Sequence, residues 1–247
     1  MNMIIKETNL NLIYPRISDY RKKFIISEDM LNDNFQPPMI LPIDDEIPEN
    51  VPRIILKSKN NHSTLNIGLS VAGFLTRYDN TFSDNWSECK NYLESRTHSI
   101  YKLINTMTDN SNIFTGLITN IIIDGLDVNG LDVLKKSLLN NGRQLGNLYD
   151  ILCKFTYVYQ DKYYINITLN NQRDNKMSIY NGRSFIENEI ENNMIAVSID
   201  VNDRYKSNSD PRYISSEKEL SEILNITTNI INNKLLSLIE KGVFNYE

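Results

Sequence analysis

The sequence is poor in the residue types from which most catalytic and cofactor-binding sites are built. Its 247 residues include nine glycines, two histidines and two cysteines. The glycines form neither G-x-x-x-x-G-K-[ST] nor G-x-G-x-x-G, the loops in which backbone N–H groups approach a phosphate. The ligands for a structural zinc site and a G-x-S-x-G nucleophile elbow are missing as well. We therefore expect no cofactor and predict none of these enzyme classes.

Long apolar runs and a secretion signal are also missing. No stretch approaches the roughly 18 apolar residues of a membrane span, and no charged segment followed by an apolar one stands at the N-terminus. Cys89 and Cys153 each lie in a periodic apolar segment, where a free cysteine behaves as a small buried hydrophobe. We therefore expect a cytoplasmic protein that does not bind membranes and keeps both thiols reduced and unpaired.

The charge balance disfavours nucleic acid as the main ligand. The formal net charge is −5 and the pI is about 5.2, whereas domains that hold phosphate backbones usually have a pI above about 9. Asparagine occurs 35 times and alanine only twice, which is typical of an AT-rich genome and predicts a source of low GC content. The asparagines are scattered among apolar periodic segments, so they do not indicate a disordered tract.

Hydrophobic periodicity predicts two long amphipathic helices. The first is expected at 84–107, where Trp86, Cys89 and Leu93 begin an apolar stripe at helical spacing. The second is expected at 216–241, where Ser216 and Glu219 fit a capping box. A short helix is expected at 130–139.

Short alternating or continuous apolar runs predict the strands. The expected strands are 2–14, 21–27, 53–58, 64–78, 113–124, 153–160, 163–169 and 194–201. The continuous run Ile121 to Ile123 predicts a central strand covered on both faces. Five prolines between 35 and 52 predict an extended connection that follows the surface.

The order of these elements predicts an α+β fold, with an antiparallel or mixed sheet and the two long helices packed on one face. We expect one compact domain over residues 1–247. Each strand-rich stretch is followed by one long helix, so the order also hints at two similar halves, about 1–125 and 126–247, from a diverged internal duplication.

Carboxylates gather around the predicted strand 194–201. Glu187 precedes this strand, and Asp200 and Asp203 lie at its end. Three carboxylates are a candidate ligand set for a divalent ion that acts on a phosphodiester. Acidic side chains beside a loop are also commonly just solvated, so both interpretations stay open.

Tyrosines gather on either side of the turn expected at 161–162. Tyr159 and Tyr164 are candidate partner-binding residues, because a tyrosine on a half-exposed sheet offers both a large ring and a hydroxyl group. The alternative is that these tyrosines only fill a wide, half-wet sheet.

Three short motifs recur in the same order as in a known group of proteins. They are I-P-E-N-V-P-R-I at residues 47–54, T-G-L-I-T-N-I-I-I at 115–123 and A-V-S-I-D-V at 196–201. With them the chain resembles a sporadically distributed family of uncharacterised prokaryotic proteins, although Thr119 replaces an aromatic residue of the family pattern. The patchy distribution of that family implies genes that move between genomes, as mobile-element and phage-defence genes do.

The absence of catalytic signatures favours a non-enzymatic binding or interaction protein. We expect its partner to be another protein or a second copy of the chain, and its role to be accessory to a phage-defence, mobile-element or toxin–antitoxin-like system. One alternative is a metal-dependent phosphodiesterase or nuclease that uses the acidic stretch near Asp200. Another is a chaperone-like protein that holds clients along an exposed strand edge or apolar groove.

Overall fold

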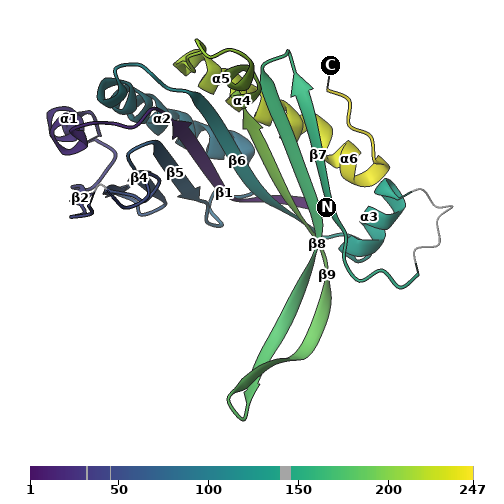
Figure 1. Cartoon of the computed structure of the whole chain (residues 1–247). Helices are drawn as coiled ribbons and strands as arrows, with labels where there is room; N and C mark the ends of the chain where they lie inside the picture. Colours follow the sequence, from purple (N-terminus) through teal and green to yellow (C-terminus); the bar gives the residue numbers. More distant parts are fainter. Residues whose placement is uncertain (32, 45, 140–145, 247) are drawn as a thin grey trace.

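A large antiparallel sheet forms the centre of the molecule in the computed structural model (Figure 1). The structure describes residues 1–31, 33–44, 46–139 and 146–246, with only the backbone described at 174–177 and 185–192. The nine strands are arranged in the order β2-β3-β4-β5-β1-β6-β9-β8-β7. The prediction of an α+β fold with an antiparallel sheet is therefore confirmed.

The strands are β1 (Asn2–Ile13), β2 (Met39–Ile40), β3 (Ile54–Lys57), β4 (Ser63–Ile67), β5 (Val71–Arg77), β6 (Phe114–Asp124), β7 (Leu152–Tyr159), β8 (Tyr163–Tyr180) and β9 (Arg183–Asn202). The helices are α1 (Tyr20–Ser27), α2 (Trp86–Thr108), α3 (Gly130–Leu138), α4 (Arg204–Ser209), α5 (Glu217–Asn229) and α6 (Leu235–Lys241). A 3-10 turn, η1 (Glu28–Leu31), follows α1, and a π-helical turn, η2 (Ile230–Lys234), joins α5 to α6.

The two parts of the chain meet where β1 pairs with β6 at the middle of the sheet. In the first part, β1 is followed by α1, by the meander β3-β4-β5 whose last strand returns to β1, and by α2. In the second part, β6 is followed by α3, by the meander β7-β8-β9 whose last strand returns to β6, and by α5. The same order of elements thus occurs on both sides of the central pair.

The helices cover one face of the sheet and leave the other face open. Burial alternates along β6: Leu117 and Ile121 are buried toward the helices, whereas Ile118 and Ile122 are only half-buried. Figure 1 shows α2, α5 and α6 on the same side of the sheet, and the indole N–H of Trp86 on α2 donates to the Thr228 hydroxyl on α5 at 3.0 Å. β6 is central as predicted, but the prediction that both its faces are covered is wrong.

Residues 20–27 form the helix α1 and not the predicted strand. Its buried side chains are Tyr20, Phe24 and Ser27, which are spaced as one face of a helix. Ile25 and Ile26, the β-branched pair that indicated a strand, are exposed. The expected strand 64–78 is also divided, because the chain turns at 68–70 and β4 pairs with β5.

The helical segment that ends the chain departs from one regular helix. Ser216 and Glu219 form the predicted capping box, with both reciprocal hydrogen bonds present. The segment then passes through η2 before it continues as α6. α2 begins after the N-cap Asn85, whose side chain accepts a hydrogen bond from the Ser87 N–H, so its first residue, Trp86, lies two residues after the expected start of the helix at 84.

The proline-rich connection is held in place by a buried arginine. Arg53, just before β3, is fully buried, and its guanidinium donates to four backbone carbonyl oxygens. These oxygens belong to Asp44, Ile47, Pro48 and Val51, at distances from 2.6 to 3.3 Å. One side chain therefore fixes the path of a segment whose prolines cannot donate ladder hydrogen bonds.

Gly242 ends α6 in a conformation and a space that only glycine fits. Its φ is +68°, and a Cβ atom there would lie 2.1 Å from the carbonyl oxygen of Ser137 on α3. We expect Gly242→Ala to lower the free energy of unfolding by about 2–3 kcal/mol, since backbone strain and a backbone clash add. Urea unfolding followed by circular dichroism measures the loss.

Gly182 is the matched control for this substitution. Its φ is +72°, but nothing lies within 4 Å of the position of a Cβ atom. Gly182→Ala is therefore expected to cost only the strain of the left-handed backbone, about 1 kcal/mol. Equal losses at the two positions would show that the packing of α6 on α3 contributes nothing.

Candidate functional site

The open face of the sheet is rich in asparagine. We use this name for the side chains of β1 and β3 to β9 that point away from the helices. Strand register places its residues in rows, one of which runs Asn9, Ile118, Asp200, Asn166 and Thr156 from β1 to β7. The asparagines of the open face are Asn9, Asn11, Asn66, Asn120, Asn166, Asn170 and Asn202. Amide side chains both donate and accept hydrogen bonds, so this surface suits a polar ligand.

A polar hollow of about 370 Å³ lies at one end of the open face. It is formed where β7, β8 and β9 lie side by side and the chain enters α4. The residues that line it are Lys154, Thr156, Tyr164, Asn166, Asp200, Asn202, Arg204 and Asn208. The hollow therefore contains two residues selected from the sequence, Asp200 and Tyr164.

The carboxylate of Asp200 is held in place by two amides. Asn166 donates from Nδ2 to Asp200 Oδ2 at 3.1 Å, and Asn202 donates from Nδ2 to Asp200 Oδ1 at 2.9 Å. The Thr156 hydroxyl in turn donates to Asn166 Oδ1 at 2.8 Å. This chain of hydrogen bonds crosses β7, β8 and β9 and gives the floor of the hollow a fixed arrangement of donors and acceptors.

Two cations border the hollow without a carboxylate partner. Lys154 on β7 and Arg204 at the start of α4 are exposed, and neither forms an ion pair with any residue that the structure describes. The Arg204 guanidinium lies 5.5 Å from the ring centroid of Phe114. With Asp200 the hollow carries a formal charge of +1, opposite in sign to the net charge of −5 of the whole chain.

The two candidate tyrosines lie on opposite faces of the sheet. Tyr164 is half-buried on the open face, and its ring meets the Tyr205 ring edge to face at 5.3 Å between centroids. Tyr159 points to the helix face, where its ring meets the Tyr246 ring edge to face with 4.7 Å between the ring centroids. Tyr159 therefore packs beneath the last residues of the chain, and Tyr164 faces the solvent side of the hollow.

Asp203 is buried and has a structural role, whereas Asp200 lines the polar hollow. Its Oδ1 accepts from the Thr115 N–H at 2.7 Å, and its Oδ2 accepts from the hydroxyls of Tyr213 and Ser215 at 2.7 and 2.5 Å. Burial raises the pKa of Asp203 above its ordinary value, although these hydrogen bonds act in the opposite direction. The carboxylate thus ties the start of β6 and the end of β9 to the loop before α5.

The third carboxylate candidate, Glu187, lies in β9, with its side chain outside the described residues. Among the side chains that the structure describes, no group of three or more His, Cys, Asp and Glu residues is arranged to hold a metal ion. Cys89 and Cys153 are both free, as predicted, and burial raises the pKa of the Cys89 thiol to about 12. A thiol with so high a pKa is a poor nucleophile.

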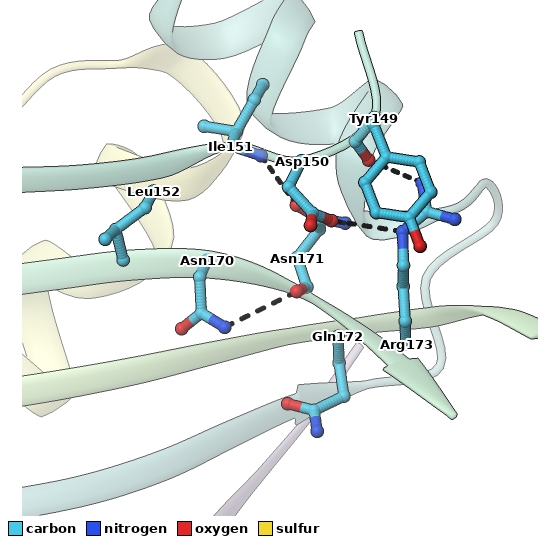
Figure 2. A pocket seen from close by; sticks show the side chains of 8 residues that line it. All are labelled: Tyr149, Asp150, Ile151, Leu152, Asn170, Asn171, Gln172 and Arg173. Carbon is cyan, nitrogen blue, oxygen red and sulfur yellow. Dashed lines mark hydrogen bonds and ion pairs between the residues drawn. The ribbon is translucent and has the colours of Figure 1, made fainter. Parts of the chain in front are cut away.

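A second hollow of about 490 Å³ lies at the other end of β7, and Figure 2 shows that its polar side chains bind one another. Arg173 donates from Nε to Asp150 Oδ1 at 3.0 Å, and its guanidinium lies 4.0 Å from the Tyr149 ring centroid. Asn171 donates to the same Asp150 oxygen at 3.0 Å and accepts from the Ile151 N–H at 2.8 Å. These contacts anchor the entry into β7, and the charged groups neutralise each other.

Sequence reasoning missed the two cations of the polar hollow. Lys154 alternates with the apolar residues of β7, which indicates a side chain on the face opposite Phe155. Arg204 follows the strand end that the sequence predicted. Nothing in either pattern says that the two residues border one hollow, because that requires the pairing of β7, β8 and β9.

No family model and no curated protein matches this sequence. In the part of the chain that the structure describes, none of the helices has the length and apolar character needed to cross a membrane.

Proposed function

We propose that this protein is a non-enzymatic binding protein whose open face takes an acidic segment of a partner protein. The observation that carries the proposal is the polar hollow, where Lys154 and Arg204 have no carboxylate partner among the described residues. Asp200 does not compete for them, because two asparagines already bind it. A carboxylate of the partner completes this arrangement with charge-assisted hydrogen bonds.

The rest of the open face supports a polypeptide ligand. Its asparagines present amide donors and acceptors that match the N–H and C=O groups of an extended backbone. Rows of side chains cross eight strands from β3 to β7. At about 4.8 Å between neighbouring strands, such a row is about 34 Å long, enough for roughly ten extended residues. The net charge of −5 disfavours the long polyanion of a nucleic acid, whereas the local charge of +1 in the polar hollow suits a short acidic segment.

The two alternatives receive less support from the described residues. For a metal-dependent nuclease, only Asp200 faces the hollow, because Asp203 is buried and saturated with hydrogen bonds. For a chaperone-like protein, the middle of the open face mixes the apolar residues Leu75, Ile118 and Ile122 with Asn9 and Asn11, so polar groups interrupt its apolar surface.

Reversing both charges of the hollow tests the proposed function. We expect Lys154→Glu combined with Arg204→Glu to weaken binding at least about tenfold, because the partner carboxylate then meets like charge. Tyr164→Ala is expected to weaken binding by about 1–3 kcal/mol through loss of a ring contact. The partner is isolated from the native host with the wild type as bait, identified, and titrated with each variant by calorimetry.

Two variants outside the hollow serve as controls. Lys218 is an exposed lysine on α5, so Lys218→Glu changes the charge of the helix face and is expected to leave binding unchanged. Tyr159→Ala removes a packed ring from the helix face and is expected to reduce stability without reducing affinity. Equal affinities of the hollow variants and Lys218→Glu would refute the proposal.

We also propose that the chain is one compact domain of two similar halves derived from an internal duplication. The repeated order of strand, helix, three-stranded meander and helix on both sides of the β1–β6 pair supports it. The long helix of each half, α2 in the first and the segment from α5 to α6 in the second, packs on the same face of the sheet. The open face is then a joint product of both halves.

From the family resemblance alone, we propose that the protein is an accessory component of a phage-defence, mobile-element or toxin–antitoxin-like system. Genes for the binding partner are then expected beside its own gene.

A further inference from the structure

The paired strands β8 and β9 extend beyond the sheet as an arm, which we define as residues 173–191. Within the sheet β8 pairs with β7 and β9, but in the arm the two strands pair only with each other, from Arg173 and Glu191 to Tyr180 and Arg183. Figure 1 shows this ribbon leaving the body of the molecule. An isolated two-stranded ribbon is marginally stable in water, so the arm needs a surface to pack against.

The tip of the arm carries exposed apolar side chains. Ile179 is 78% exposed and Tyr180 is 70% exposed, beside a turn formed by Asn181 and Gly182. Both turn residues have positive φ, 50° and 72°, as in the tight turns that suit the twist of a hairpin. Arg183 is exposed next to them, so the tip combines two large apolar groups with one positive charge.

An apolar pocket of about 450 Å³ lies between the N-terminus, the loop after β6, α3 and α6; we call it the end pocket. Its apolar walls are formed by Met1, Leu126, Val128 and Val133. Its charged residues are three carboxylates, Asp127, Asp132 and Glu240, and one lysine, Lys136. With the amino group of Met1, the lining carries three negative and two positive charges, so the end pocket offers the tip an apolar enclosure with a net charge of −1.

The tip cannot reach the end pocket of its own chain. α3 packs against β9 next to the base of the arm, where a Cβ atom at Gly130 would lie 2.2 Å from the Met194 carbonyl oxygen. The tip lies roughly eight residues farther along β8, or about 25 Å away. A second copy related by a two-fold axis, with its arm antiparallel to the first, brings each tip to the base of the other copy.

We propose that two copies of this chain form a dimer by exchanging arms. The tip of each arm enters the end pocket of the other copy end-on, so that Ile179 and Tyr180, whose side chains lie on opposite faces of the ribbon, pack against opposite sides of the pocket formed by Leu126, Val128 and Val133. Arg183 then faces the carboxylates of Asp127 and Glu240. The contact is isologous, so it closes on itself and does not lead to filaments.

Sedimentation velocity over a range of concentrations tests this dimer. The wild type is expected to be dimeric, and Ile179→Ser combined with Tyr180→Ser is expected to raise the dimer dissociation constant at least about tenfold. Val128→Arg, at an exposed position of the end pocket, is expected to have the same effect. Ile25→Ser with Ile26→Ser removes an equally exposed apolar pair from α1 and is expected to leave the dimer intact.

Mixing the two disrupted variants gives a second readout. The tip variant keeps an intact pocket and the pocket variant keeps an intact tip, so their mixture is expected to form a heterodimer through one of the two contacts. A monomeric wild type, a dimer that survives both sets of substitutions, or a mixture that stays monomeric would overturn the proposal. The hollow variants Lys154→Glu and Arg204→Glu are expected to remain dimeric, so this test is independent of partner binding.

Discussion

Arg53→Met is expected to lower the free energy of unfolding by about 3–5 kcal/mol, the largest effect of any single substitution considered for this protein. The guanidinium of Arg53 is fully buried and donates to four backbone carbonyl oxygens between Asp44 and Val51. Methionine has a similar length but no donor, so these acceptors lose their partners together. The removed charge no longer has to be desolvated, which offsets part of the loss and keeps the total below the sum of four charged hydrogen bonds.

Equilibrium unfolding in urea measures this loss, and limited proteolysis reports on the proline-rich segment directly. We expect the segment from 44 to 51 to become cleavable in Arg53→Met while the sheet stays folded at low urea. Arg16→Met is the control, because Arg16 is half-exposed and pairs with Glu49 of the same segment at 3.1 Å. An exposed pair of this kind contributes at most about 1 kcal/mol. A loss of similar size in both variants would contradict the role given to Arg53.

Asp203→Ala is expected to lower the free energy of unfolding by about 3–4 kcal/mol. The substitution leaves three donors without an acceptor: the backbone N–H of Thr115 and the hydroxyls of Tyr213 and Ser215. These donors lie on β6 and on the loop before α5, so the substitution removes the hydrogen bonds that join the start of β6 and this loop to the same carboxylate. Thermal unfolding followed by circular dichroism measures the effect, and an unchanged midpoint would exclude a structural role for Asp203.

The dependence on pH separates the charge of Asp203 from its hydrogen bonds. Burial raises the pKa of this carboxyl above its ordinary value of 3.8, so the folded protein holds the proton more tightly than the unfolded chain does. The stability that protonation adds is complete below the unfolded pKa and is lost as the pH rises through the folded pKa. As the pH is lowered from about 7 to about 4, the free energy of unfolding of the wild type is therefore expected to increase relative to that of Asp203→Asn. A relative loss over this interval would show that the hydrogen bonds outweigh burial.

Hydrophobic periodicity in the sequence was sufficient to predict a helix where the helix buries one continuous apolar stripe. Trp86, Cys89 and Leu93 are all buried on α2, and the predicted helix 84–107 nearly coincides with its bounds. The same reasoning failed at 21–27, because Phe24 is the one large apolar residue that this segment buries and the adjacent Ile25 and Ile26 point to solvent. A short helix that packs through so few residues has too little periodic signal to outweigh β-branched composition.

The arm could not be predicted from apolar periodicity, since its strands pair only with each other. The strand 163–169 was expected from its buried residues Ile165, Ile167 and Leu169, but β8 continues to Tyr180. Burial in the sheet produces the alternation of apolar residues, and beyond Asn171 the ribbon has left the sheet. Only the turn residues Asn181 and Gly182 gave a local signal for the extension.

The sequence allowed individual residues of the candidate site to be predicted from their types, but it did not show which of them lie together in the fold. Asp200 and Tyr164 were selected because a strand-end carboxylate and a sheet tyrosine are useful groups, and both line the polar hollow. Tyr159 was selected for the same reason but faces the helices, because the sequence cannot say which face of an amphipathic strand is covered. The grouping of Lys154 with Arg204 depends on strand order, which is a long-range property.

The central pairing of β1 with β6 sets the timing of folding during synthesis. β1 ends at Ile13 and β6 begins at Phe114, so about a hundred residues must be made before the second strand is available. At roughly 5–20 residues per second, β1 waits on the order of ten seconds for β6, whereas β5, the strand at its other edge, is made earlier. During that interval the first part of the chain presents a sheet edge that can pair with other nascent chains. Arrival of β6 closes this edge, and slow translation upstream of Phe114 prolongs the exposure.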